Sequence, residues 1–170
     1  MCLGEITEVV ELTEEMEVYK VFKHEEMFTP FGEVYRGLSR VYWGKEEVIP
    51  MHLWINEVDW REYFSQNVIQ IIPGEIRYDT GWHCFVNLGD ARKVVSKLDG
   101  FDYVVVKALV KGKVTFGADG VGGALPGAKV VVSKLMNVLE IIGDKQIARD
   151  VTDGTIQTSE EMGRREAVVV

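Results

Sequence analysis

Residues 81–110 constrain the fold of this chain more than any other stretch, because they predict a strand, a helix and a second strand in succession. Residues 81–85 read Gly-Trp-His-Cys-Phe, a composition typical of a strand that begins after a turn. In residues 88–98 apolar side chains recur at helical spacing, and Asn87 is placed to cap the helix. The apolar run of residues 103–110 then predicts a buried strand.

Strand-like segments surround this block on both sides. Alternating or β-branched residues predict strands, with turns between them, in residues 17–23, 33–43, 51–58, 75–85, 114–116 and 129–142. Residues 5–12 and 59–72 fit a strand or a helix equally well, and Gly112 separates two predicted strands. Residues 117–127 contain five glycines and a proline, which predicts a mobile loop.

Together these segments predict an α+β fold in a single domain, residues 1–143. We expect a strongly bent, mostly antiparallel sheet of six to eight strands, with the helix of residues 88–98 packed across one face. The polar residues 144–170 should form an appendage that is partly disordered or docked on a partner. The predicted core consists of Leu88, Ala91, Val94, Val95, Leu98, Val104, Val106, Val131 and Leu135.

Composition places the chain among cytoplasmic globular proteins. It has 170 residues, 46% hydrophobic and 27% charged, enough for one substantial core. No apolar run approaches the roughly 20 residues that cross a bilayer, and no secretory signal opens the sequence. We therefore expect no membrane partner, and we expect Cys2 and Cys84 to be reduced.

The negative charge is concentrated at the start of the chain. The net charge is −8, and residues 1–26 contain eight glutamates and two lysines, a balance of −6. No segment has a basic excess, so we expect no nucleic-acid partner. The acidic start is typical of a solvated face, and it could also dock on a basic protein partner.

Cys2 is the first candidate for catalysis. Removal of Met1 would leave an N-terminal thiol whose own amine can act as a base, and His83 could serve as a base instead. This pattern fits an N-terminal-cysteine hydrolase or transferase. The simpler interpretation is that Cys2 packs as a small hydrophobic residue.

A second pattern involves Tyr35 and Arg36 together with Trp82 and His83. A Tyr-Arg-Gly strand and a later strand that leads into a helix are similar in outline to ADP-ribosyltransferase-like folds, in which such residues grip a nicotinamide dinucleotide. That resemblance implies NAD as a substrate; otherwise no cofactor is expected. The three histidines do not have the spacing of metal ligands, so no metal site is predicted.

The landmarks taken together resemble a family of small phage and bacterial proteins whose function is not established. The shared outline begins with Met1-Cys2-Leu3, a Val-Tyr-Lys-Val strand at residues 18–21 and a Thr-Pro-Phe turn at residues 29–31. It continues with the Gly-(Phe/Trp)-His-x-Phe motif, which reads Gly-Trp-His-Cys-Phe at residues 81–85. The resemblance covers about residues 1–140 and implies a protein of a virus or mobile element. It supplies no reaction.

The sequence therefore leads to three hypotheses about function. The first is an accessory protein without catalysis that binds a protein partner through its acidic start or its tail. The second is an ADP-ribosyltransferase-like or dinucleotide-binding protein, and the third is a cysteine enzyme at Cys2. Convergence of Cys2, Arg36 and His83 in one concave pocket would favour an enzyme.

Overall fold

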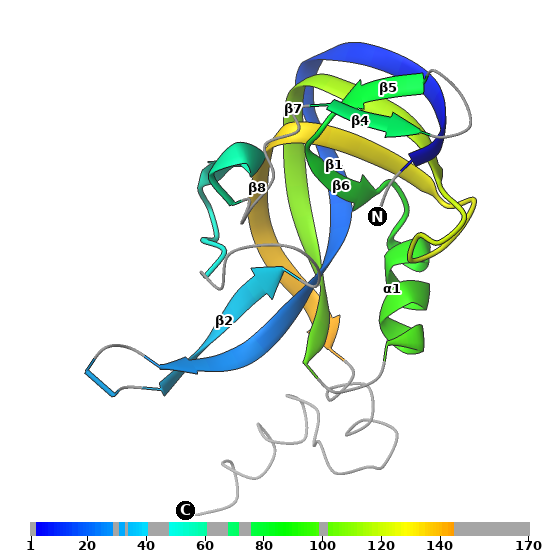
Figure 1. Cartoon of the computed structure of the whole chain (residues 1–170). Helices are drawn as coiled ribbons and strands as arrows, with labels where there is room; N and C mark the ends of the chain where they lie inside the picture. Colours follow the sequence, from blue (N-terminus) through cyan, green and yellow to red (C-terminus); the bar gives the residue numbers. More distant parts are fainter. Residues whose placement is uncertain are drawn as a thin grey trace, which may run out of the picture.

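The computed structural model describes residues 3–28, 31–32, 34–40, 48–60, 68–71, 76–98 and 102–144. These residues form a mostly antiparallel sheet structure with a single α-helix (Figure 1). The strands are β1 (Leu3–Phe28), β2 (Val34–Arg40), β3 (Trp54–Asn56), β4 (Val68–Ile71), β5 (Ile76–Asp79), β6 (Trp82–Phe85), β7 (Tyr103–Asp119) and β8 (Lys129–Asp144). The helix α1 spans Leu88–Lys97, and a 3-10 helix spans Glu57–Trp60.

Four of the strands form a closed circuit of backbone pairing. β1 pairs with β7 along nearly its whole length, β7 pairs with β8, and the first residues of β8 pair with β6. The circuit closes where Tyr19 of β1 pairs with Phe85 of β6. β2 and β3 extend this six-stranded sheet, while β4 and β5 form a separate hairpin. The strongly bent sheet that the sequence predicts is therefore present.

The long strands bend at irregularities in their pairing. β1 and β7 change register between Leu12 and Met16, where β1 has extra residues opposite Lys111, next to Gly112. Gly112 has φ +75°, a conformation that glycine adopts without steric cost. The prediction of two strands separated by Gly112 is wrong, because residues 103–119 form the single strand β7, in which Gly112 lies at a bulge in the pairing with β8.

Two layers of apolar side chains lie on the two faces of the closed sheet. The inner layer includes Trp82, Cys84 and Val106, and Ile49 and Ile55 pack against it. The outer layer includes Phe85, Val105 and Val130 and is covered by the buried face of α1, which lies beside the closed sheet in Figure 1. Six residues of the predicted core are buried, and Leu88, Leu98 and Leu135 are half-buried.

Helix α1 begins at the predicted position but not with the predicted cap. The side chain of Asn87 makes no capping hydrogen bond to the backbone. Its Nδ2 instead donates to Asp90 Oδ2 at 3.4 Å, and Asp90 in the first turn faces the positive end of the helix dipole. At the C-terminal end of the helix, the Leu98 N–H donates to the carbonyls of Val94 and Val95.

The bounds of other elements differ from those that the sequence predicts. The strand expected over residues 51–58 is confined to β3, because the chain turns into the 3-10 helix at Glu57. Residues 5–12 belong to β1, and residues 68–71 form β4. The predicted appendage beyond Asp144 lies outside the described residues. In the part of the chain that the structure describes, no helix is long and apolar enough to cross a membrane.

Candidate functional site

The predicted site residue His83 belongs to a buried polar network on the outer face of the sheet. Its Nε2 lies 3.0 Å from the hydroxyl of Tyr78, and its Nδ1 lies 3.1 Å from the carbonyl oxygen of Gly81. The Tyr78 hydroxyl also accepts a hydrogen bond of 3.0 Å from the backbone N–H of Leu3. Both rings are buried, and they meet edge to face with centroids 5.8 Å apart. The network therefore ties the start of β1 to β5 and β6.

The partners of His83 determine its tautomer. The Gly81 carbonyl can only accept a hydrogen bond, so Nδ1 carries a proton and donates it. With Nδ1 protonated, the neutral ring accepts at Nε2, and Tyr78 donates its hydroxyl hydrogen there. The same hydroxyl oxygen remains an acceptor for the Leu3 N–H. Each of these groups is satisfied when His83 is neutral, which is the form a base must start from.

Strand alternation separates His83 from its neighbour Cys84, as the sequence predicts. Cys84 points into the inner layer, and its Sγ lies 3.8 Å from the sulfur of Met136. Burial raises the pKa of the Cys84 thiol to about 11, against a weaker lowering effect of Lys20. The thiol is therefore protonated at neutral pH, and Cys84 is a structural residue and not a nucleophile.

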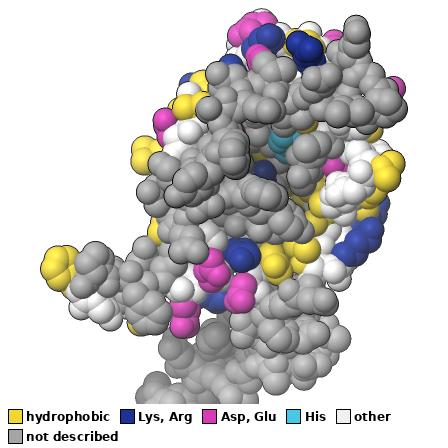
Figure 2. All heavy atoms as spheres, viewed as in Figure 1, with side chains coloured by type: hydrophobic (Ala, Val, Ile, Leu, Met, Phe, Trp, Pro, Cys, Tyr) yellow, Lys and Arg dark blue, Asp and Glu magenta, His cyan; other side chains and the backbone are white. Residues whose placement is uncertain are grey.

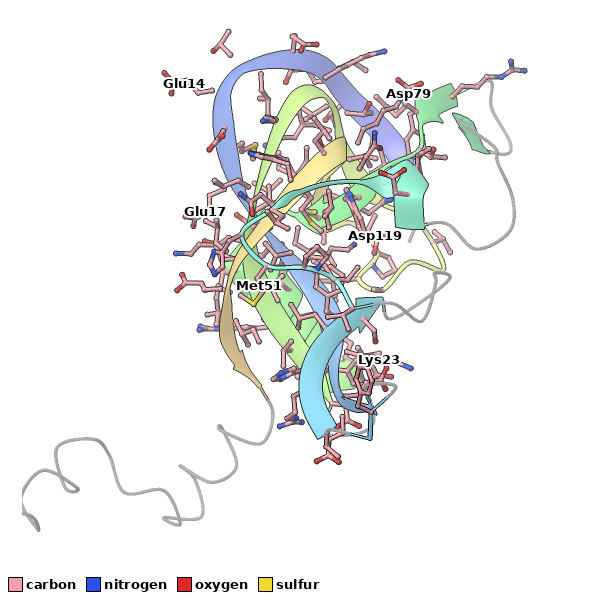
Figure 3. All side chains as sticks on the ribbon, turned by 90° about the vertical axis from the view of Figure 1, so that its left-hand side faces the viewer. Glu14, Glu17, Lys23, Met51, Asp79 and Asp119 are labelled. Atoms are coloured by element: carbon pink, nitrogen blue, oxygen red, sulfur yellow. The ribbon has the colours of Figure 1, made fainter. Side chains whose placement is uncertain are left out.

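A small hollow lies beside this network, with a volume of about 90 Å³. Val132 forms part of its wall and is the cross-strand partner of both His83 and Thr115, so the three residues form a row across β6, β8 and β7. Asp79 projects from the end of β5 at the rim (Figure 3). The hollow is lined by Asp79, Thr80, Lys113, Thr115, Val132 and Lys134.

The hollow is too small for a dinucleotide. Pockets for drug-sized ligands measure roughly 300–1,000 Å³, several times the 90 Å³ found here. Three groups at the rim are charged: Lys113 Nζ lies 3.4 Å from Asp79 Oδ2, and Lys134 Nζ lies 4.0 Å from the same oxygen. The site is therefore suited to a small polar or charged ligand.

Arg36, the other described candidate of the enzymatic hypotheses, lies elsewhere. It is exposed on β2, where its Nη2 donates to the His24 carbonyl at 3.0 Å and lies 3.9 Å from Asp102 Oδ1. Its cross-strand partner Glu26 follows Tyr19, the β1 residue paired with Phe85 of β6, by seven residues. Seven residues of extended strand span roughly 23 Å. Arg36 and His83 therefore do not share a pocket.

Of the remaining candidates, Trp82 is the one whose side chain the structure describes. Trp82 is fully buried in the inner layer, and its indole N–H donates to the Ile55 carbonyl at 3.3 Å. The side chain of Tyr35 and the whole of Cys2 lie outside the described residues. The arrangement that a dinucleotide site would require is thus not formed by Arg36, Trp82 and His83. Within the described residues, no group of three or more acidic, histidine or cysteine side chains could hold a metal ion.

The second candidate site is formed by the end of β1 and by β2, which we call the β1–β2 arm (residues 24–28, 31–32 and 34–38). The strand pairing of β1 with β7 stops at Lys23, and residues 24–28 pair with β2, although the His24 N–H still donates to the carbonyl of Asp102, just before β7. Figure 1 shows this arm leaving the closed sheet, and Figure 2 shows a hydrophobic side chain at its far end. Phe31 at the tip is 92% exposed, and Val34 is also exposed.

The outer edge of the arm presents backbone groups. The carbonyl of Leu38 points away from β1, since it accepts the N–H of Ile49 at 2.8 Å. In an antiparallel pair every second residue has the same orientation, so Val34 and Arg36 also direct their N–H and C=O groups outward. Among the described residues, no backbone partner occupies these outward groups.

The glutamates of β1 are almost all exposed to solvent. Glu14 and Glu17 point away from the closed sheet in Figure 3. Lys107 of β7 partly compensates them: its Nζ lies 3.8 Å from Glu17 and 2.6 Å from Glu140. The hydrogen bond to Glu140 and the nearby carboxylates raise the pKa of Lys107. The exposed glutamates are Glu5, Glu8, Glu11, Glu14, Glu15, Glu17 and Glu26.

Comparison with protein-family models, with curated proteins and with solved structures finds no match. The resemblance to small phage and bacterial proteins therefore stays a prediction.

Several residues around His83 and the hollow are not predicted from the sequence. Tyr78 precedes the Gly-Trp-His motif by a few positions, but nothing in the local sequence indicates that its hydroxyl reaches His83 and Leu3. Lys113 and Thr115 lie in a segment that the sequence predicts only as a strand. Their position beside Asp79 depends on the pairing of β7 with β8, which local composition does not encode.

Proposed function

We propose that this chain is an accessory protein that binds a protein partner, and that the β1–β2 arm is the docking element. The observation on which the proposal rests is the arm itself. It leaves the closed sheet with outward backbone groups at Val34 and Arg36 and with Phe31 exposed at its tip. A two-stranded hairpin is at best marginally stable in water, and a third strand would stabilise it.

The partner should supply an extended segment that pairs with the outer edge of β2. Pairing of this kind takes its affinity from backbone hydrogen bonds and its specificity from the side chains on alternate positions. Natural sheets rarely leave an edge open without protection. The outward groups of Val34 and Arg36, which have no backbone partner among the described residues, are therefore a reason to expect a partner. Phe31 would add an aromatic anchor at the end of the arm.

The negative charge of β1 favours a partner with a basic surface. Seven exposed glutamates lie along this strand, so a partner with a basic surface would associate faster, and high salt would slow that association. The resemblance to small phage and bacterial proteins supports the search for this partner in a bacterial host cell. The absence of a convergent catalytic group at Arg36 and His83 favours binding over catalysis.

The proposal is tested by capture from bacterial lysate with wild-type protein and two variants. Phe31→Ser removes the apolar tip of the arm, and Val121→Ser removes a fully exposed apolar side chain from the loop between β7 and β8. We expect proteins captured by the wild type to be retained by Val121→Ser and reduced at least tenfold by Phe31→Ser, since an aromatic anchor is worth about 2 kcal/mol or more. Equal capture by all three proteins would show that the arm is not the docking element.

A further inference from the structure

The hollow beside His83 contains an arrangement that the proposed docking function does not use. Lys113 on β7 and Lys134 on β8 both direct their ammonium groups toward one oxygen of Asp79. Two positive charges thus face one negative charge at the rim. Glu11 is the cross-strand partner of Lys113, but within the described residues these two side chains form no ion pair. The carboxylate that lines the hollow is that of Asp79.

The wall of the hollow adds hydroxyl groups to these charges. Thr80 and Thr115 both line it. Thr115 is only 5% exposed, and within the described residues its side chain makes no hydrogen bond. Because Thr115 lines the hollow, its hydroxyl is placed to form a hydrogen bond with a ligand or a water molecule that enters there.

We propose that this hollow is a binding site for a small oxyanion, a carboxylate or a phosphate group. The two ammonium groups donate to the oxyanion, the Thr115 hydroxyl gives a further hydrogen bond, and Asp79 holds the lysines in place when the site is empty. The volume of about 90 Å³ admits only a few non-hydrogen atoms. A cation is disfavoured because it would lie between two ammonium groups.

The role of Asp79 gives the proposal a distinctive signature. Its carboxylate competes with an incoming anion for the same two lysines, so Asp79→Asn should tighten the binding of an anion. For a bound cation, the same substitution would weaken binding. The lysines are 61% and 55% exposed in their side chains, so water screens these effects, and we expect changes of about threefold to tenfold.

The experiment is a titration of the isotope-labelled full chain, followed by amide chemical shifts, with inorganic phosphate in one arm and acetate in the other. Chloride at equal ionic strength is the control for screening. We expect saturable shifts at residues 79–80, 113–115 and 132–134 with phosphate, acetate or both, and the responding arm identifies the class of oxyanion. Lys113→Ala and Lys134→Ala should each weaken binding by at least threefold, and Asp79→Asn should tighten it.

Lys93→Ala is the matched variant, because Lys93 is an exposed lysine in an ion pair with Asp90 on α1, away from the hollow. It should leave binding unchanged. The proposal is overturned if neither anion gives saturable shifts below about 50 mM, a range that already includes weak millimolar affinity. It is also overturned if Lys93→Ala weakens binding as much as the two lysine variants do, or if Asp79→Asn weakens it.

Discussion

At the scale of single residues, Tyr78 of β5 connects β1 and β6 beside the hollow. Its hydroxyl accepts from the Leu3 N–H and donates to His83 Nε2, so one oxygen satisfies a backbone donor and a ring acceptor. Leu3 itself is buried in the outer apolar layer. Tyr78 therefore positions the first residues of β1 and holds the His83 ring through Nε2.

Tyr78→Phe should show how much this network contributes to the free energy of unfolding. The substitution keeps the ring and removes the hydroxyl to which the Leu3 N–H and His83 Nε2 are hydrogen-bonded. Losing the partner of a buried polar group costs about 1–3 kcal/mol, so we expect a loss of at least about 1–3 kcal/mol in the free energy of unfolding, measured with urea. Tyr103→Phe is the control, because Tyr103 packs on the same outer layer and is only half-buried. Equal effects of the two substitutions would contradict the assigned network.

At the scale of elements, the loop between β7 and β8 differs from the mobile loop that its glycines predict. Asp119 is buried at the end of β7, and its Oδ2 accepts the Leu125 N–H at 2.8 Å. Gly127 N–H donates to the Asp119 carbonyl, and Asp119 N–H donates to the Ala128 carbonyl, both at 2.8 Å. The loop is thus organised around one carboxylate, with Gly123 packed directly against it.

Gly123→Ala should open this loop. A Cβ at position 123 would lie 2.1–2.5 Å from the three carboxyl atoms of Asp119, closer than any real contact. Either Asp119 or the loop must move, which breaks the hydrogen bond to Leu125, and we expect a loss of roughly 2 kcal/mol in the free energy of unfolding. Gly89→Ala in α1 meets no atom within 4 Å and should be neutral or slightly stabilising. Urea unfolding of both variants decides this, and equal stability would show that Asp119 does not organise the loop.

The elements also show how far the sequence predicts structure. Helix α1, β6 and the alternation of His83 and Cys84 follow from local patterns, and the structure confirms them. The bulge at Gly112 and the 3-10 helix after β3 were not predicted, because both depend on the paired strand. The lysine–aspartate arrangement of the hollow joins three strands, and periodicity within one segment cannot reveal such a contact.

At the scale of the whole molecule, closure of the sheet is what the sequence could not predict. It depends on one pairing, Tyr19 with Phe85, between segments that are far apart in the chain. Closure creates an inner layer that excludes water completely at Trp82, Cys84 and Val106. It also explains why the interior offers no room for a ligand at these positions and why both candidate sites lie on the outside.

Because Cys84 is buried in the inner layer, we expect the free energy of unfolding of the whole molecule to fall at alkaline pH. Burial raises the pKa of this thiol from 9.0 to about 11, so between these values the unfolded chain loses its proton before the folded chain does. The unfolded state then binds fewer protons, and stability falls as pH rises through this window.

The size of this effect follows from the two pKa values. Between pH 8 and pH 10 the thiol ionises in the unfolded chain and stays mostly protonated in the folded chain. One pH unit above the pKa of the unfolded thiol corresponds to about 1.4 kcal/mol, so over this range the wild type should lose about 1.4 kcal/mol in the free energy of unfolding relative to Cys84→Ala. Urea unfolding of both proteins at the two pH values measures this difference, and groups that titrate equally in both proteins cancel from it. A stability difference that stays constant between pH 8 and pH 10 would mean that the thiol ionises equally in both states, and thus that water reaches the inner layer of the closed sheet.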